Sequence, residues 1–188
     1  MSILPLRLCR TALLSLLACT AIIASAQGLG RPASLDSIRL PQGLTAQTAD
    51  LAVRGSIGDG RAVFLDRATV MSFPEHSFTC VDGWDGKTHK FTGALLDDLL
   101  ERAGISPSAT RITVTARNKY TIPIRRVDYK KFGYLLAWKI DDHFFADDSA
   151  TKNRGMFIIA IDFARHSQLD PELYKHQLVW QVNDILAE

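Results

Sequence analysis

Cys80 and Trp84 are the residues of this chain whose types and settings are best suited to chemistry. Cys80 lies near the end of a β-rich run at 77–81, and a thiolate there would be a soft ligand for a metal ion. Trp84 lies between two turn signals, Asp82-Gly83 and Asp85-Gly86, where its ring could stack on a flat heterocycle. Both also have a structural interpretation, because most free cysteines are small buried hydrophobes and a tryptophan in a turn can cover the core.

Arg154 and Gly155 follow a polar loop and precede an apolar run at 156–161. The Arg154 guanidinium can fork onto a carbonyl, a phosphate or ring nitrogens, and Gly155 lets a ligand approach the backbone closely. Tyr120 begins a strand after three polar residues and could supply an aromatic wall and a hydroxyl. Each also has a structural interpretation. Arg154 and Gly155 could be a turn with a solvated charge, and Tyr120 could be an aromatic residue of an edge strand.

Two acids and the histidines complete the candidates. Asp128 and Asp162 could accept the N–H groups of an aminopyrimidinone ring, although lone acids of this kind are more often helix caps or ion-pair partners. The 5 histidines show no H-x-x-x-H or similar metal-ligand spacing. The chain has no glycine-rich phosphate loop, no C-x-x-C pair and no G-x-S-x-G motif. The residues therefore point to a binding pocket without a familiar catalytic motif.

The segment 1–26 has the pattern of an export signal. A positive region with two arginines precedes an apolar run at 11–24, and Ala24-Ser25-Ala26 is a small-x-small cleavage signal. We expect a Sec-type signal peptide, cleavage after Ala26 and a periplasmic protein; a lipoprotein signal ending at Cys19 is an alternative. Because the segment contains no acid, its removal turns the net charge of +2 into zero. A neutral chain argues against nucleic acid as the partner.

The remaining chain predicts a flexible leader at 27–50 and one domain at 51–188. The main helix is predicted at 92–103, with Thr92 as its cap and a leucine stripe on one face. Short helices are predicted at 66–71, 126–131 and 169–175. Strands are predicted at 51–57, 61–65, 77–81, 87–91, 111–116, 120–124, 134–140, 156–161 and 177–185. Short strands with one main helix predict an α+β fold built on a mixed or antiparallel sheet.

From about Leu51 to the C-terminus, the order of short motifs resembles the sulfite-oxidase-like molybdopterin-binding fold. No single motif is specific, and the resemblance depends on their order and spacing. The motifs are Leu51–Gly55, residues 74–79 leading to Trp84, Phe91-Thr92-Gly93, Asn118-Lys119-Tyr120 with Ile122-Pro123, Asp128, residues 137–141, Arg154-Gly155 and Val179-Trp180-Gln181. The chain departs from the family's usual Gly-Pro with Gly155-Met156.

The resemblance implies one of two functions. In catalytic members of the family, a cysteine at the Cys80 position binds the molybdenum of a molybdopterin cofactor. Some small exported members are pterin-binding regulators that act on a membrane signalling protein, such as a cyclase/phosphodiesterase or a kinase sensor. This chain is similar to the second group in its length, in its lack of a basic cluster for a phosphate arm and in the lack of a twin arginine within residues 1–10.

We therefore expect a periplasmic pterin-binding protein that senses a reduced or oxidised pterin for a membrane signalling partner. The expected ligand-binding residues are Cys80, Trp84, Tyr120, Asp128, Arg154 and Gly155. The alternative is a molybdopterin-dependent oxidoreductase in which Cys80 is the molybdenum ligand.

Overall fold

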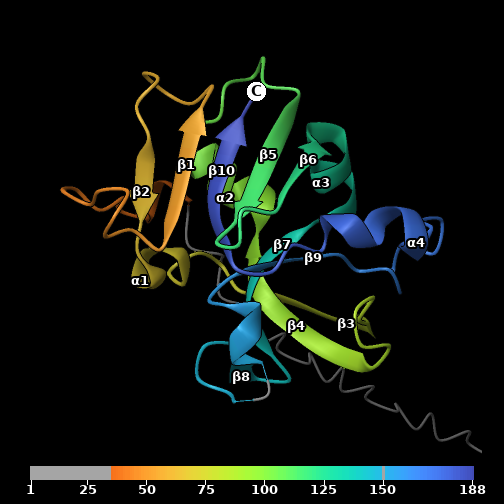
Figure 1. Cartoon of the computed structure of the whole chain (residues 1–188). Helices are drawn as coiled ribbons and strands as arrows, with labels where there is room; N and C mark the ends of the chain where they lie inside the picture. The colour runs from red at the N-terminus through yellow and green to blue at the C-terminus, as the bar shows by residue number, and fades with distance from the viewer. Residues whose placement is uncertain (1–34, 150) are drawn as a thin grey trace, which may run out of the picture. The chain divides into compact units, whose positions relative to one another are not determined.

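The computed structural model describes residues 35–149 and 151–188. The predicted export signal and residues 27–34 of the predicted leader lie outside this part of the chain. The described strands form two β-sheets, which a few short helices accompany (Figure 1). The fold is therefore mixed α and β, as the sequence predicts, but its strands are divided between two sheets.

The first sheet has the strand order β2-β1-β10-β5-β6. β1 and β10 are parallel, and the other neighbours are antiparallel. Pro123 lies on the edge strand β6, where its missing N–H leaves no ladder bond unmade, as the sequence predicts. The strands are β1 (Leu51–Gly55), β2 (Val63–Leu65), β5 (Arg111–Ala116), β6 (Thr121–Arg125) and β10 (Val182–Ala187).

The second sheet has the order β3-β4-β7-β8, and β9 also pairs with β7. All its pairs are antiparallel, and Cys80 on the edge strand β3 lies opposite His89 on β4. At Gly93 the backbones of β4 and β7 come so close that a Cβ atom would lie 2.2 Å from the Leu136 carbonyl oxygen. The strands are β3 (His76–Val81), β4 (Thr88–Leu95), β7 (Leu135–Ile140), β8 (His143–Phe144) and β9 (Ile158–Ala160).

The helices are short, and the predicted main helix is wrong at its beginning. β4 continues through Thr92 to Leu95, so α2 begins at Leu96, and α2 and α3 are each 7 residues long. The physical reason is that Thr92 is β-branched and pairs with Lys139, which favours the strand over a helical first turn. The helices are α1 (Arg67–Val70), α2 (Leu96–Arg102), α3 (Arg126–Phe132) and α4 (Pro171–Tyr174), with 3-10 turns η1 (Leu35–Ser37), η2 (Lys152–Arg154) and η3 (Lys175–Gln177).

The apolar core consists of two clusters. The larger one joins the buried face of the first sheet to the leucines of α2, and the smaller one gathers around Cys80, Phe91 and Phe145 in the second sheet. Ile38, within the predicted leader, is buried in the larger cluster, and its carbonyl accepts a hydrogen bond of 2.8 Å from Nε of Arg102. Among the described residues, no helix is both long and apolar enough to cross a membrane.

Candidate functional site

Cys80 is held near the end of β3 with its side chain turned into the smaller core cluster. The residue is buried, and Sγ lies 3.5 Å from the carbonyl oxygen of Ile161, to which the thiol donates. Burial raises the pKa of the thiol to about 11, and the nearby charges of Asp162 and Asp82 act in the same direction. At neutral pH Cys80 is therefore a thiol rather than a thiolate.

Cys80 lies at one end of a small cavity, which we call the thiol cavity. Its free volume is about 10 Å³, which is room for about one water molecule. Its walls come from β3, the turn after it, β9 and the chain leading into β10. The polar and aromatic lining residues are Cys80, Asp82, Trp84, Phe91, Arg154, Phe163 and Trp180.

Arg154, at the end of η2, is buried and already fully engaged by acids. Its Nη1 donates to Oδ2 of Asp82, which is also buried, and its Nη2 donates to Oδ2 of Asp85 at 3.1 Å. The guanidinium carbon lies 4.6 Å from the centre of the Trp180 ring, in a cation–π contact. In this arrangement the Arg154 charge is neutralised within the protein.

His89 extends this ion-pair network to a second turn. Its Nε2 lies 3.0 Å from Oδ2 of Asp85, and its Nδ1 lies 2.6 Å from Oδ2 of Asp141. Because both ring nitrogens face carboxylate oxygens, the arrangement favours the doubly protonated imidazolium form of His89. Partial burial acts to lower the pKa of His89, but the hydrogen bonds to Asp141 and Asp85 outweigh it and raise that pKa.

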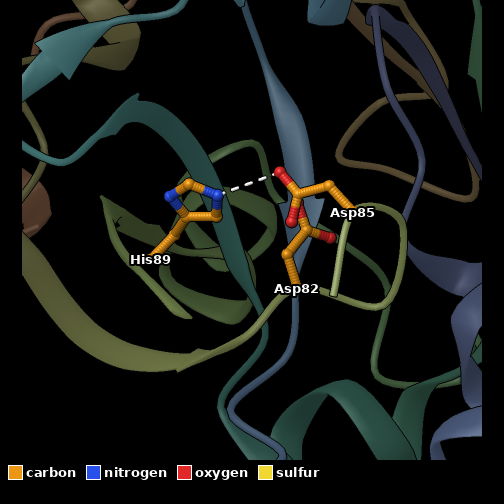
Figure 2. A group of neighbouring side chains, drawn as sticks. All are labelled: Asp82, Asp85 and His89. Atoms are coloured by element: carbon orange, nitrogen blue, oxygen red, sulfur yellow. Dashed lines mark hydrogen bonds and ion pairs between the residues drawn. The ribbon is translucent and has the colours of Figure 1, made fainter. Parts of the chain in front are cut away.

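Asp82, Asp85 and His89 come close enough together to suggest a metal site. One ligand atom from each lies within 4.8 Å of the others, and Figure 2 shows the His89 ring pointing at the Asp85 carboxylate. The same carboxylates are already compensated by Arg154 and by the His89 imidazolium. A metal ion would have to replace these two cations, so the cluster as it stands is an ion-pair network.

A larger depression, the aromatic groove, lies on the other side of Trp84. It has a volume of about 250 Å³ and is bounded by Trp84, Tyr120 and Trp180. Trp84 is 50% exposed and Tyr120 is 42% exposed, and the Trp84 and Trp180 ring centres are 5.7 Å apart. The remaining lining residues are Ala116, Asn118, His176, Leu178 and Val179.

Backbone carbonyls orient the two exposed rings of the groove. Trp84 Nε1 donates to the Leu178 carbonyl at 3.1 Å, and the Tyr120 hydroxyl donates to the His176 carbonyl at 2.8 Å. The polar ends of both rings are thus held, which leaves their faces for contact. Trp84, Leu178 and Trp180 line both the groove and the thiol cavity, so the two spaces share a wall.

The structure brings most of the sequence-predicted site residues together. Cys80, Trp84 and Arg154 line the thiol cavity, and Tyr120 joins Trp84 in the aromatic groove. Gly155 follows Arg154 but packs against the protein, because a Cβ atom there would lie 2.8 Å from Cα of Gln181.

Asp128 is placed elsewhere, at the beginning of α3. Its carboxylate is buried and accepts from Nε and Nη2 of Arg125 at 2.8 and 2.9 Å, and it lines neither the cavity nor the groove. Asp128 is therefore an ion-pair partner, which was its structural interpretation from the sequence.

Sequence reasoning missed Asp82, Asp85, His89 and Trp180 as site residues. Asp82 and Asp85 were interpreted only as turn residues, and each does accept from the backbone of its own turn through Oδ1. Their second oxygens are the ones that face Arg154. The Asp-x-x-Asp spacing across Trp84 is visible in the sequence. Its role depends on Arg154, which comes 72 residues after Asp82 and 69 residues after Asp85.

Comparison with known proteins gives a likeness of fold. No protein-family model and no curated protein matches the chain. Among solved structures, the chain is similar to the sulfane dehydrogenase SoxCD from Paracoccus pantotrophus, with a TM-score of 0.57 and 12% sequence identity. The match covers 77% of this chain and 39% of the SoxCD chain. At 12% identity the likeness shows a similar fold, and the sulfite-oxidase-like superfamily remains a resemblance of the sequence motifs.

The residues of the thiol cavity do not fit the molybdenum cofactor of that superfamily. The free volume beside Cys80 is about 10 Å³, which is room for about one water molecule and not for a pterin-bound metal. The one arginine of the cavity lining is already paired with Asp82 and Asp85, so it offers no free positive charge to an anionic cofactor. We therefore derive no chemistry through molybdenum at this site.

Proposed function

We propose that this protein binds a flat, uncharged heterocycle of the pterin class and acts as a non-catalytic ligand sensor. The observation that carries the proposal is the aromatic groove, in which Trp84 and Tyr120 are half-exposed rings whose polar ends are held by backbone carbonyls. Stacking between such rings and a flat ligand contributes about 0.5–1.5 kcal/mol per ring beyond the area buried. The likeness of fold to a protein of a molybdopterin family favours a pterin among flat heterocycles.

The size and polarity of the groove support a small neutral ligand. A volume of about 250 Å³ lies just below the roughly 300–1,000 Å³ of pockets for drug-sized ligands, which suits one bicyclic ring system. The groove is lined mainly by aromatic and aliphatic residues, and Asn118 and His176 are its polar lining residues beside the Tyr120 hydroxyl. No Lys or Arg side chain lines it among the described residues, so it offers no partner to a phosphate arm.

Trp84 is the residue through which binding would be sensed. It lies in the turn between β3 and β4, and that turn is tied to Arg154 and His89 through Asp82 and Asp85. A ring inserted beside Trp84 would displace this turn and alter the neighbouring edge strand, where Val81 is exposed. In this proposal the protein is periplasmic, as the segment 1–26 predicts, and the altered surface acts on a membrane-bound cyclase/phosphodiesterase or kinase sensor.

The test is calorimetric titration of pterin into the purified protein and its variants. Trp84→Ala and Tyr120→Ala should each weaken binding about tenfold, which corresponds to the loss of about 1.4 kcal/mol of stacking. Leu173→Ala is the matched control, because Leu173 is 70% exposed and lies outside the groove lining. Unchanged affinity in both aromatic variants would exclude the groove as the site.

The second candidate is a molybdopterin-dependent oxidoreductase, which the likeness to SoxCD favours. Native mass spectrometry of protein isolated from its own host separates the two. A mass increment of one pterin without molybdenum supports the sensor. A molybdenum–pterin increment that disappears in Cys80→Ser would replace the sensor with the oxidoreductase.

A further inference from the structure

We infer that the outer edge of β3 is a docking site for an extended, acidic segment of a partner protein, which joins the second sheet as an additional strand. β3 lies at one end of that sheet, beside β4 (Figure 1). The free edge and the charges around it carry the inference without any ligand in the aromatic groove. Only the link between docking and ligand sensing rests on the proposed function.

Alternate residues of β3 turn their backbone groups away from the sheet. The Asp82 N–H donates to the Lys87 carbonyl at 2.8 Å, so Asp82 faces β4. Lys90, which lies opposite Thr79, turns its carbonyl instead to the Asp141 N–H at 2.8 Å, on the side of β7. Because bonding alternates along an antiparallel strand, the even-numbered residues of β3 bond to β4 and the odd-numbered residues face outward. The outward-facing residues are Ser77, Thr79 and Val81.

These outward groups are free in the part of the chain that the structure describes. Within 35–149 and 151–188, no turn, loop or further strand forms a backbone hydrogen bond with Ser77, Thr79 or Val81. All three residues are exposed, and Val81 is 56% exposed. Each therefore offers one N–H donor and one C=O acceptor to a strand laid alongside.

The other sheet edges are protected, whereas β3 is not. β2 and β8 are only 3 and 2 residues long, and β6 contains Pro123. β9 is covered by the chain leading into β10, since the Ile159 N–H donates to the Val179 carbonyl at 2.9 Å. β3 is 6 residues long, and its sequence, His-Ser-Phe-Thr-Cys-Val, contains no proline and no Lys, Arg, Asp or Glu. Natural proteins normally blunt such an edge, so one left in this form is suited to strand addition.

The unpaired charges around this edge are mainly basic. A depression of about 420 Å³ adjoins the His76 end of β3, between the end of α3 and the loop after β9. Lys131 and Arg165 line it, and neither side chain has an acidic partner among the described ion pairs, whereas Lys130 is held by two acids of α2. Asp162 is the one acid of the lining, and it accepts from the Arg165 backbone N–H at 3.0 Å. An acidic side chain of an added strand meets these two cations.

The same charges disfavour a second copy of this chain as the occupant. If two β3 strands paired antiparallel, the His76 end of one copy would lie beside the Val81 end of the other. Lys87 stands at the Val81 end and is exposed, and the acid of its own turn, Asp85, is engaged elsewhere. Two copies would bring cations together at both ends, whereas an acidic segment meets a cation at each end.

Val81 connects the docking edge to the proposed ligand site. It is the last residue of β3, and it lines the thiol cavity together with Trp84, which also lines the aromatic groove. A pterin that displaces the Trp84 turn therefore changes the end of the docking edge. Ligand and partner then alter each other's affinity by the same factor.

The first experiment measures binding of a short capped peptide of alternating valine and glutamate, labelled with fluorescein, by anisotropy. The control peptide has lysine in place of glutamate. The acidic peptide should bind at least about tenfold more tightly at low salt, and salt should reduce the difference. Equal affinities for the two peptides would overturn the inference.

Thr79→Pro closes the edge without breaking the sheet. The Thr79 N–H faces outward, so the proline ring removes a docking donor but no bond to β4. Thr79→Pro should weaken binding of the acidic peptide at least about tenfold, whereas Thr79→Val, which keeps the N–H, should bind it as the wild type does. An unchanged affinity in Thr79→Pro would mean that the peptide binds elsewhere.

Charge reversal tests the basic depression and leaves the strand intact. The double variant Lys131→Glu/Arg165→Glu should weaken the acidic peptide about fivefold or more. Lys152→Glu is the matched control, because Lys152 is exposed and does not line the depression. Equal losses in the double variant and the control would show attraction by net charge alone and would overturn the docking site.

Amide hydrogen exchange, read by NMR, examines the edge in the unaltered protein. The Thr79 amide should exchange faster than those of Phe78 and Cys80, and the acidic peptide should slow Thr79 most. Slow exchange of Thr79 in the protein alone would overturn the inference, because the edge would already be covered. The cover would be a second copy if the mass is dimeric and this chain itself if the mass is monomeric.

The outcomes separate this inference from the proposed function. If the acidic peptide binds wild type but not Thr79→Pro, and pterin does not bind, the docking edge stands and the pterin-sensor proposal fails. If pterin binds in the groove but Thr79→Pro and wild type bind the peptide alike, the sensor stands and the docking edge is wrong. An unchanged peptide affinity at saturating pterin would overturn the link between docking and sensing.

Discussion

His89 links two turns through carboxylates on both sides of its ring, and this arrangement makes the protein sensitive to pH. Its pKa in the folded state is raised above the ordinary value, which is about 6.5. The stabilisation is therefore complete below about pH 6.5 and is lost as the pH rises through the raised pKa. Asp85 and Asp141 stay ionised from neutral to alkaline pH. Partial burial acts to raise the pKa of each acid, but hydrogen bonds from backbone N–H groups and from His89 outweigh it and lower that pKa.

We expect the free energy of unfolding to fall from neutral to alkaline pH, and His89→Gln to flatten this decline. Urea denaturation across this range measures the effect. His176→Gln is the control, because the exposed His176 side chain has no carboxylate partner among the ion pairs of the described residues. A His89→Gln protein that keeps the wild-type slope would show that another group carries the pH dependence.

Gly155 is required by the backbone conformation and by close packing against Gln181, and not only by a possible ligand. Its φ of 80° and ψ of −159° belong to a region that is nearly exclusive to glycine, and a Cβ atom would lie 2.8 Å from Gln181 Cα. Gly155→Ala should destabilise the fold by about 3 kcal/mol, seen as a lower urea midpoint. Gly43→Ala is the control, because Gly43 has a similar φ of 81° but nothing within 4 Å. Equal losses in the two variants would mean that strain in φ, and not the contact with Gln181, sets the effect.

Individual site residues differ in how far the sequence predicts them. Cys80, Trp84 and Arg154 are recognisable because each stands out against its own neighbours, and all three meet at the thiol cavity. The protonated state of Cys80 cannot be predicted in this way, since its raised pKa comes from burial by β9 and the loop after it. The engagement of Arg154 by Asp82 likewise depends on a long-range contact.

Three of the four predicted helices and eight of the nine predicted strands begin within two residues of the observed elements. The predicted final strand at 177–185 is wrong at its beginning, because β10 starts at Val182. The boundary between β4 and α2 shows the cause of the other large error. A leucine stripe with a threonine before it predicts a helix from Thr92, but pairing with β7 keeps residues up to Leu95 in the sheet. Strand alternation is a local signal, so β5 and β6 were found within about one residue. Division of the strands into two sheets depends on pairings such as β1 with β10, which no local pattern contains.

Helix α1 shows an element whose beginning the sequence does predict. Asp66 caps it, with Oδ1 accepting from the Thr69 N–H at 2.8 Å. Asp66→Ala should lose about 1 kcal/mol of unfolding free energy, while Asp66→Asn, which keeps the acceptor, should lose less. Thermal or urea denaturation of the two variants measures the difference.

Measurements at acid pH give a second test of the Asp66 cap of α1. Hydrogen bonds from Thr69 lower the pKa of Asp66, so its contribution is present above the unfolded-state pKa of about 3.9 and is lost as the pH falls through the folded value. The stability difference between wild type and Asp66→Asn should therefore shrink in acid. A difference independent of pH would show that the charge of Asp66 contributes nothing to the cap.

The candidate site joins the two sheets. Cys80, Trp84 and His89 belong to the second sheet, where they lie on β3, in the turn after it and on β4, respectively. Tyr120 immediately precedes β6 and Trp180 lies two residues before β10, and both of these strands belong to the first sheet. The Trp84 to Leu178 hydrogen bond spans 94 positions in the sequence. Motifs can therefore predict single residues of this site, but the contacts between the residues of the two sheets depend on the fold. It also means that a ligand beside Trp84 contacts both sheets at once.

A ligand that bridges two sheets should protect both from local opening. With pterin at about 100 times its Kd, the folded state gains about 2.7 kcal/mol, and the Tm should rise by about 5–10 °C. Hydrogen exchange measured by mass spectrometry should slow in the segments that line the groove, which are 82–86, 116–120 and 176–181. The slowing there should be larger than the slowing in α1 and β2, which lie outside the groove lining. Trp84→Ala should remove this local protection. Equal slowing across all segments would indicate global stabilisation without a bridge, and slowing in the first sheet alone would place the ligand away from Trp84.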